Sequence, residues 1–255
     1  MKKQETRITF RIVQIVLLCI AIPGLILFFY SSSYYSADTA AKEALVPDDA
    51  VHIVEVGNEY TVFSPDNPMA ELIFYPGAKI EYKAYAPLMR SLAKNGILCI
   101  MMNMPYDLAI LDTEAADRVI DLFPQITHRY ICGHSLGATA AAEYAAKHAD
   151  KLDGLIMLAG YSAKNLRESG LSVLSVYGSC DSVLDLGEYK RCLELLPENK
   201  REYVIEGGCH SYFGSYGLHS GDGKPSIEPA QQTAETTEVI IMHINSDIAL
   251  REKNE

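Results

Sequence analysis

Residues 129–148 read RYICGHSLGATAAAEYAAKH, and they predict a strand, a tight turn and a helix in immediate succession. The apolar run before Gly133 is typical of a buried strand, and glycines at both flanks of the turn allow close approach of other chain segments. The alanine-rich run from Leu136 to His148 has high intrinsic helix propensity. Ser135 is therefore expected at a sharp strand-to-helix turn.

Strand-like and helix-like segments alternate on both sides of this stretch. Strand character is found in residues 51–57, 59–65, 71–77, 96–103, 129–135, 154–160, 171–178 and 201–207. Helical spacing is found in residues 82–94, 113–123, 136–148, 188–196 and 228–248. The first two strands are expected to pair antiparallel. The later alternation indicates an α/β fold, with a mostly parallel eight-stranded sheet and helices on both faces.

Residues Gly133–Gly137 match the pattern G-x-S-x-G, and the setting of the match is more informative than the match itself. A serine at a strained strand-to-helix turn lies where backbone N–H groups and the helix dipole stabilise negative charge. The pentapeptide alone is a weak signal. Between a strand and a helix, it favours Ser135 as a nucleophile over a purely structural turn.

A serine hydroxyl needs a base before it reacts, and two later strands supply the candidates. Asp181 follows the strand at 171–178, and His210 follows the strand at 201–207. Both stand at carboxyl ends of strands, the sheet edge at which catalytic groups gather in open α/β sheets. We predict that His210 takes the serine proton and that Asp181 orients the imidazole and stabilises its protonated form.

Each assignment has a competitor nearby in the sequence. Asp185 is the alternative to Asp181, which is otherwise an ordinary turn aspartate. His219 is the alternative to His210, which is otherwise an ordinary loop histidine. The remaining histidines considered are interpreted as surface or core residues; they are His52, His128, His148 and His243.

Charge that develops on a substrate oxygen needs two N–H donors aimed at it. The residue after the nucleophile, Leu136, supplies one backbone N–H. The second is expected from the loop after the strand at 71–77, where Gly77 allows the turn. Ala78 is the preferred donor, and Lys79 is the alternative.

At these residues the chain resembles the α/β-hydrolase superfamily, and more closely a compact bacterial group within it. The motifs that carry the resemblance are Tyr75-Pro76-Gly77, Tyr85-Ala86-Pro87-Leu88, Gly133–Gly137, Gly178 with Asp181, and a Gly-Gly-x-His segment followed by Phe213-Gly214 and Tyr216-Gly217. It spans roughly residues 50–248. The resemblance implies a Ser-His-Asp hydrolase that uses no metal and no organic cofactor.

Hydrolysis of a small-molecule carboxylic ester, through an acyl-Ser135 intermediate, is the function that these residues favour. Residues 161–171 leave little room for a lid, which suggests an open site. The same triad also suits acyl transfer to an acceptor other than water. From a different class, a tethered binding module with an inactive triad is disfavoured, because the serine, aspartate and histidine are all intact. The sequence gives no indication of an oligomeric state.

The six cysteines form no CxxC pair and show no zinc-type spacing, so no metal site is expected from them. Cys180 and Cys209 each immediately precede a predicted catalytic residue. A disulfide between them stays an open alternative, which requires the two loops to bring the Cα atoms within about 7 Å.

The charge of the chain is distributed unevenly. The 255 residues carry a net charge of −11, and residues 1–37 carry +3, which leaves −14 for residues 38–255. A segment with this much negative charge repels nucleic-acid phosphates and anionic lipid head groups. No nucleic-acid partner is therefore expected.

Residues 12–30 read IVQIVLLCIAIPGLILFFY, with Gln14 as the only strongly polar side chain. At about 1.5 Å rise per residue, a helix of this length nearly crosses a hydrocarbon core of roughly 30 Å. Four basic residues precede it: Lys2, Lys3, Arg7 and Arg11. We therefore expect a single-pass signal anchor in the cell membrane, in contact with the lipid bilayer through residues 12–30, with residues 1–11 in the cytoplasm and the rest outside.

A cleaved signal peptide is the alternative interpretation, and it would give a secreted protein. The apolar run exceeds the usual apolar region of about 7–15 residues, and no clear Ala-x-Ala site follows it. Ser36 and Ala37 still leave cleavage open. Residues 31–48 are small, polar and aromatic and are interpreted as a linker, so the expected catalytic domain spans residues 49–255.

Overall fold

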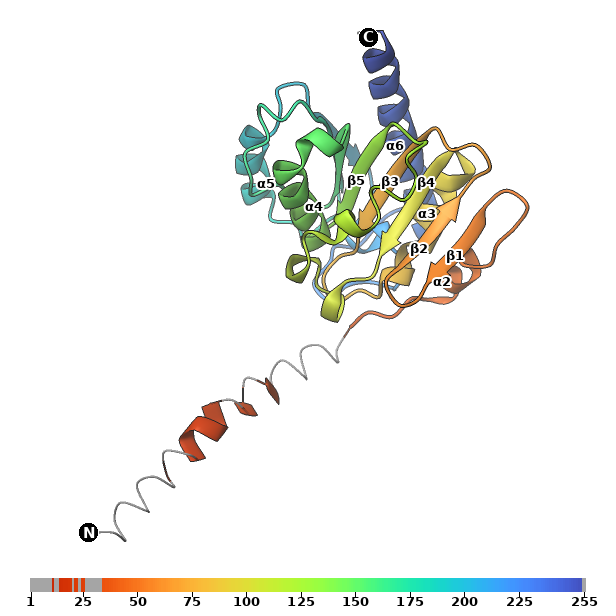
Figure 1. Ribbon diagram of the computed structural model, residues 1–255. Coiled ribbons are helices and arrows are strands. Elements are labelled where there is room, and N and C mark those ends of the chain that lie inside the picture. The colour runs from red at the N-terminus through yellow and green to blue at the C-terminus, as the bar shows by residue number, and fades with distance from the viewer. Residues whose placement is uncertain (1–10, 12–13, 20, 23, 26–33, 254–255) are drawn as a thin grey trace. The chain divides into compact units, whose positions relative to one another are not determined.

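The structure is a computed structural model that describes residue 11 and residues 14–19, 21–22, 24–25 and 34–253 (Figure 1). The chain divides into two compact units, residues 1–34 and residues 35–255. The second unit contains the whole sheet.

An eight-stranded sheet with the order β1-β2-β4-β3-β5-β6-β7-β8 forms the centre of the second unit. Its strands are β1 (His52–Val56), β2 (Tyr60–Ser64), β3 (Ala70–Tyr75), β4 (Ile97–Met102), β5 (Arg129–His134), β6 (Gly154–Leu158), β7 (Ser172–Gly178) and β8 (Arg201–Ile205). β2 pairs antiparallel with β1 and with β4, and all other neighbours pair parallel. The predicted α/β fold with a mostly parallel eight-stranded sheet is confirmed.

Helices cover both faces of the sheet (Figure 1). The α-helices are α2 (Thr39–Ala44), α3 (Ala86–Lys94), α4 (Leu136–Lys147), α5 (Leu186–Cys192) and α6 (Pro229–Glu252). Short 3₁₀ helices are η1 (Tyr82–Tyr85), η2 (Pro105–Asp107), η3 (Ala109–Leu111), η4 (Ala115–Arg118), η5 (Ala149–Lys151), η6 (Leu193–Leu195) and η7 (Ser211–Phe213). Side chains of α2, α3 and α6 enter one hydrophobic core, and those of α4 enter another.

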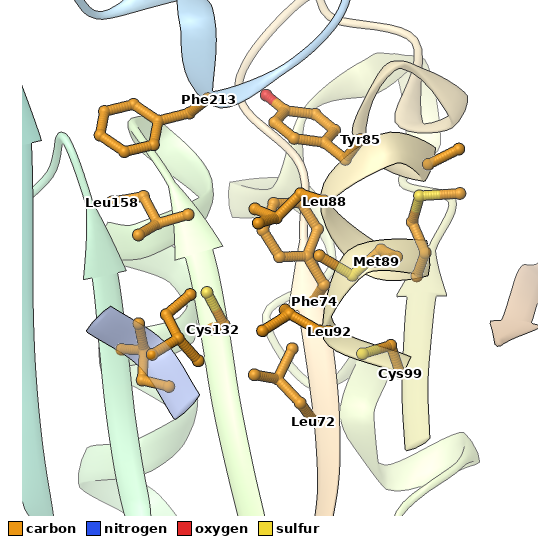
Figure 2. Close-up of a cluster of buried hydrophobic side chains, with 14 of the residues drawn as sticks. Leu72, Phe74, Tyr85, Leu88, Met89, Leu92, Cys99, Cys132, Leu158 and Phe213 are labelled. Carbon is orange, nitrogen blue, oxygen red and sulfur yellow. The ribbon is translucent and has the colours of Figure 1, made fainter. Parts of the chain in front are cut away.

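The central strands are apolar on both faces because both faces are covered. In β3, Leu72 and Phe74 belong to one core, Ile73 and Tyr75 belong to the other, and all four are fully buried. Figure 2 shows the first pair beside Met89 of α3. Burial of one such side chain contributes roughly 1.5–3 kcal/mol, so this strand holds two helical layers together.

The predicted helix at residues 113–123 is wrong, because only Ala115–Arg118 is helical there, as a 3₁₀ turn. The hydroxyl of Tyr75 donates to the Thr113 carbonyl at 2.9 Å and accepts the N–H of Ala116 at 2.7 Å. A buried side chain from β3 thus forms hydrogen bonds with backbone groups of this segment that a continuous helix would use. Tertiary packing overrides a sequence with good helix propensity.

The linker expected at residues 31–48 is folded from residue 35 onward. Residues 39–44 form α2, whose first turn is capped by the Asp38 side chain. The N–H of Tyr35 donates to the Lys79 carbonyl at 2.7 Å, and its carbonyl accepts the N–H of Glu81 at 2.9 Å. The folded unit therefore begins about fourteen residues before the predicted boundary at residue 49, because this backbone pairing joins Tyr35 to it.

The predicted anchor at residues 12–30 lies partly outside the described residues. Of this range, residues 14–19, 21–22 and 24–25 are described, and they are helical. No helix among the described residues is both long enough and apolar enough to cross a membrane.

Candidate active site

Ser135 lies at the turn between β5 and α4, with φ 54° and ψ −122°. A positive φ is costly for a residue with a Cβ, so the surrounding chain must hold this turn. The Ser135 N–H donates to the Leu158 carbonyl at 2.8 Å. The flanking glycines are required by contact, because a Cβ on Gly133 would lie 2.3 Å from the Gly137 oxygen, and one on Gly137 would lie 2.3 Å from the Pro76 oxygen.

His210 and Asp181 are hydrogen-bonded, with 2.9 Å between Nδ1 of the ring and Oδ2 of the carboxylate. The histidine follows β8 and the aspartate follows β7, and their side chains are only 4% and 0% exposed. Oδ1 of Asp181 accepts the N–H groups of Val183 and Leu184, each at 2.8 Å. These bonds fix the carboxylate, which in turn fixes the imidazole and leaves Nε2 as the ring atom able to take a proton.

Ser135 and His210 line the same pocket, which has a volume of about 210 Å³. The pocket is lined by Ser135, Leu136, Thr139, Ala159, Gly160, Tyr161, Val183, Leu184, Asp185 and His210. Within residues 34–253, no hydrogen bond joins the Ser135 hydroxyl to the His210 ring. Such bonds are often long or poorly aligned without substrate, so the shared pocket is the relevant observation.

A larger pocket, of about 590 Å³, lies at the loop after β4. Its lining residues are Asn58, Glu59, Asn103, Met104, Pro105, Tyr106, Asp107, Asp112 and Arg118. These described residues include no serine, cysteine or histidine, so they offer no nucleophile and base together. Size therefore does not identify the reactive site here, and the smaller pocket contains the groups suited to chemistry.

The backbone N–H groups of Leu136 and Ala78 are the two predicted oxyanion donors. Across residues 34–253, neither N–H donates to a protein acceptor. By contrast, the N–H of Lys79 donates to the Asp107 carbonyl at 2.8 Å. An N–H with no internal acceptor is available to a substrate oxygen, so the geometry favours Ala78 over Lys79 as the second donor.

Gly77 allows close packing of neighbouring side chains. The residue of its loop with a left-handed backbone conformation is Lys79, with φ 59°. A Cβ on Gly77 would lie 2.8 Å from Nδ1 of His134 and 2.9 Å from both the Tyr85 hydroxyl and Cδ1 of Ile80. The turn expected at Gly77 is therefore two residues later. Glycine is needed because two buried polar groups press against this position.

Tyr85 and His134 form a fully buried pair behind the loop and the nucleophile turn. The Tyr85 hydroxyl accepts the N–H of Gly77 at 3.0 Å and lies 2.8 Å from Nδ1 of His134. The His134 ring lies 4.7 Å from the His210 ring, centroid to centroid. Burial, followed by the neighbouring His210, holds the pKa of His134 well below its ordinary value, so this ring is neutral.

The competitors identified in the sequence have other partners. Oδ1 of Asp185 caps α5 by accepting the N–H groups of Gly187 and Glu188, each at 2.9 Å. Nδ1 of His219 donates to the Ser220 carbonyl at 2.7 Å. Neither side chain hydrogen-bonds to Asp181 or His210 within the described range, so the structure pairs the preferred residues instead.

The loops that carry Cys180 and Cys209 do meet, because the Cys180 N–H donates to the Gly208 carbonyl at 2.8 Å. Both thiols are free. Burial raises the pKa of the Cys209 thiol to about 12, so this side chain is a neutral, buried group. The loops are joined by backbone hydrogen bonds and not by a disulfide.

Glu114, Asp117 and His148 bring potential ligand atoms within 4.8 Å of one another. The carboxylates already pair with lysines, because Lys147 Nζ lies 2.8 Å from Glu114 and Lys151 Nζ lies 2.7 Å from Asp117. His148 follows the C-terminus of α4, at the end opposite Ser135. This cluster is a surface ion-pair network remote from the pocket.

Residues 71–234 match the family model described as the alpha/beta hydrolase family. This range is more than half of the chain and includes Ser135, Asp181 and His210. The chain belongs to the α/β-hydrolase family. Family membership supports a hydrolase. It does not by itself define the bond that this α/β-hydrolase cleaves, because one fold supports many reactions.

Solved structures of similar fold include TT1662 from Thermus thermophilus, at 16% identity and a TM-score of 0.59, with 76% of this α/β-hydrolase and 98% of that chain covered. A predicted CIB-like hydrolase from Thermoplasma acidophilum is 15% identical, with a TM-score of 0.54, and the match covers 75% of this chain and 98% of that one. A monoacylglycerol lipase from Paleococcus ferrophilus is 13% identical, with a TM-score of 0.56, and the match covers 75% of this chain and 99% of that one. At these identities the likeness establishes the fold alone. No curated protein sequence matches the chain.

Proposed function

We propose that this α/β-hydrolase is a membrane-anchored serine hydrolase that cleaves carboxylic esters. Ser135 is the nucleophile, His210 the general base and Asp181 the acid that orients it. The observation that carries the proposal is one pocket containing the strained serine and a histidine hydrogen-bonded to a buried aspartate. Two unoccupied backbone N–H groups belong to the same arrangement.

In the first half of the reaction, Nε2 of His210 takes the Ser135 proton while Oγ attacks the carbonyl carbon of the ester. The carbonyl electrons move onto the oxygen, which accepts N–H groups from Leu136 and Ala78. Collapse of this intermediate breaks the bond to the alkoxide, and the imidazolium returns its proton to that leaving group. An acyl-serine and a free alcohol result.

Water then repeats the sequence on the acyl-serine, with His210 again as base. Asp181 keeps the proton on Nδ1 of the ring, because Oδ2 is its acceptor at 2.9 Å. The N–H donors of Val183 and Leu184 hold that carboxylate in place through Oδ1. No residue has to move between the two halves, since base and oxyanion donors serve both.

The pocket favours esters with a small acyl or alcohol group. Its volume of about 210 Å³ lies below the roughly 300–1,000 Å³ typical of ligand sites. Residues 159–171, which include part of its lining, contain no helix that could form a lid. We expect activity against short-chain p-nitrophenyl esters to exceed that against long-chain ones, and strict dependence on micellar long-chain lipid would contradict this preference.

A fluorophosphonate probe tests the nucleophile directly, because it reacts covalently with an activated serine. The full-length protein in detergent should be labelled, and Ser135→Ala should lose labelling and at least about 10⁴-fold in kcat. Equal labelling of both proteins would refute the assignment. Product analysis with added alcohols or amines separates hydrolysis from acyl transfer.

The membrane anchor is the second part of the proposal, and it is supported by residues 12–30 and the basic residues before them. The described part of this segment is helical, and large apolar side chains such as Ile15 and Leu17 are exposed on it. Exposed apolar surface of this kind suits a lipid environment. We infer a cytoplasmic N-terminus and an extracytoplasmic catalytic domain.

Protease treatment of intact cells tests the orientation. Externally added protease should degrade the catalytic domain while a cytoplasmic control protein survives. Protection of the domain until the cells are lysed would overturn the inferred orientation. Recovery from the medium of a chain that lacks its N-terminal segment would instead favour a secreted form.

A further inference from the structure

Asp222 connects the two loops that carry His210 and Asp181. Its Oδ2 accepts the N–H and the hydroxyl of Ser211, at 2.8 and 2.6 Å. Its Oδ1 accepts the N–H of Gly223 at 2.8 Å, of His210 at 3.3 Å and of Ser182 at 3.4 Å. The carboxylate of Asp222 thus binds His210, Ser211 directly after it, and Ser182 directly after Asp181.

These contacts differ from those of an ordinary turn aspartate. A capping aspartate binds N–H groups two or three residues ahead, as Asp185 does in α5. Four of the five donors to Asp222 lie on segments 11 to 40 residues away, and only Gly223 is local. Asp222 is therefore placed to set the position of one loop against another.

The carboxylate is well suited to this task because it is ionised. Partial burial raises the pKa of Asp222, but the hydrogen bonds from Ser211 and Gly223 outweigh that effect and leave the pKa below its ordinary value. An ionised carboxylate accepts on both oxygens and donates nothing, which matches a surrounding made of donors.

The packing beside Asp222 leaves little freedom. A Cβ on Gly223 would lie 1.8 Å from the carbonyl oxygen of Cys180, so this segment is pressed directly against the loop that carries Asp181. The hydroxyl of Ser211, held by Asp222, also accepts the N–H of His219 at 2.8 Å. Asp222 itself does not line the pocket that contains Ser135.

We propose that Asp222 is a positioning residue, which holds the His210 loop against the Asp181 loop so that the imidazole stays aligned with both Asp181 and Ser135. The proposal rests on the function proposed above. Without the carboxylate, the five donors lose their shared acceptor. The two loops then keep the Cys180–Gly208 backbone bond, the bond from the Gly207 N–H to the Ser179 hydroxyl at 2.8 Å and the His210–Asp181 pair.

Asp222→Asn is the main test, because it keeps the size of the side chain while placing an NH₂ group against donors. A small displacement of a catalytic group can cost on the order of 10²-fold in rate, so we expect kcat to fall by about 10- to 100-fold. KM should change less than about twofold, since the pocket lining is intact. The rate of fluorophosphonate labelling should fall in parallel with kcat, because it reports serine activation.

Asp153→Asn is the matched control. Asp153 is also a partly buried carboxylate that accepts a backbone N–H, from Arg129 at 2.9 Å, but it lies at the opposite end of the strands. Both variants should lower the melting temperature, and only Asp222→Asn should lower kcat. If the two variants keep wild-type kcat, or if kcat falls equally in both, Asp222 has no positioning role.

Ser211→Ala keeps the test decisive if Asp222→Asn does not fold. It removes one donor to the carboxylate and leaves the others, so we expect a folded protein with kcat reduced about 3- to 10-fold. An unchanged kcat in Ser211→Ala, together with an unfolded or fully active Asp222→Asn, overturns the proposal. Failure of the wild type to react with the probe would instead count against the proposed function.

Discussion

The two edges of the central sheet both hold an aspartate with a basic partner, yet the pocket that contains a serine and a histidine lies at one of them. At the carboxyl edge, Asp181 binds His210 beside the Ser135 turn. At the amino edge, Asp153 accepts the N–H of Arg129 and pairs with Arg251 of α6, at 2.9 and 3.0 Å. Both aspartates are fixed by backbone donors and by a basic partner.

The difference lies in what surrounds each pair. The basic partners of Asp153 are Arg251, which keeps its proton at all ordinary pH values and cannot act as a base, and His128, whose Nδ1 lies 3.4 Å from Oδ2 of Asp153. His128 lines neither of the two pockets described above. The partner of Asp181 is the imidazole of His210, which lines a pocket together with Ser135 and with Leu136, whose backbone N–H has no acceptor among the described residues. Burial and ion pairing alone therefore do not mark a catalytic site. An exchangeable proton beside an open pocket does.

Replacing each aspartate by asparagine should give the largest contrast between the edges. Asp181→Asn should lower kcat by about 10³- to 10⁴-fold, because the imidazole loses the acceptor that fixes its tautomer. Asp153→Asn should leave kcat within about twofold and lower the free energy of unfolding by about 1–2 kcal/mol. Steady-state kinetics with a p-nitrophenyl ester and urea unfolding measure the two effects.

This comparison fails if the two substitutions affect kcat alike. A fall in kcat for Asp153→Asn would mean that the amino edge is coupled to the chemistry. Full activity in Asp181→Asn would mean that His210 acts without the aspartate.

The second-largest effect is expected for Glu71, at the amino edge, and it concerns the free energy of unfolding. Glu71 is fully buried, and neither of its carboxylate oxygens has a hydrogen-bond partner among the described residues. Burial raises the pKa of Glu71 from 4.5 to about 8, a shift opposed by nearby Arg129. Between these pH values the folded state binds the extra proton, so the free energy of unfolding falls as the pH rises from about 4.5 to about 8.

Glu71→Gln removes this titration, so the variant should gain stability over wild type as the pH rises. We expect the difference to grow by roughly 2–4 kcal/mol between pH 5 and pH 8.5. Urea unfolding at both values measures it, with kcat at pH 7 as a control that should stay within about twofold. Parallel stability curves for the two proteins would show that this carboxyl does not titrate in the predicted range.

Gly77→Ala, at the carboxyl edge, should give the smallest of the three effects, a reduction in kcat. The added Cβ meets Nδ1 of His134 at 2.8 Å and the Tyr85 hydroxyl at 2.9 Å, so the loop that carries Ala78 has to shift. Loss or displacement of one oxyanion donor lowers kcat, and partial displacement should cost about 10- to 100-fold. Kinetics with the melting temperature as a control measure it, and an unchanged kcat would exclude Ala78 as a donor.

Much of the fold is readable from the sequence because the strands are buried on both faces. Segments such as 97–102 and 154–160 are apolar without interruption, as is typical of a strand that is covered on both faces. Serine, aspartate and histidine follow three different parallel strands, β5, β7 and β8, which places them at one edge. That topology predicts the pairing of Asp181 with His210, and the hydrogen bond between them sets aside Asp185 and His219.

Other features depend on contacts that no local pattern contains. The segment 113–123 has helical composition, but the Tyr75 hydroxyl takes its backbone groups. Asp222 lies in a loop rich in glycine and serine, and nothing around it indicates that it binds residues near 182 and 210. Tyr85 was recognisable as part of a family motif, whereas its bond to His134 was not.

The backbone pairing of Tyr35 bears on the choice between the proposed anchored form and a secreted form. Signal peptidase acting after Ala37 would discard the residue whose N–H and carbonyl bind Lys79 and Glu81, which lie one and three residues after Ala78. The Tyr35 side chain, which accepts the Ser220 N–H at 3.1 Å, would be lost as well. Processing at that position would release a domain with a damaged reaction centre, so a recombinant soluble form should retain the tyrosine at its start.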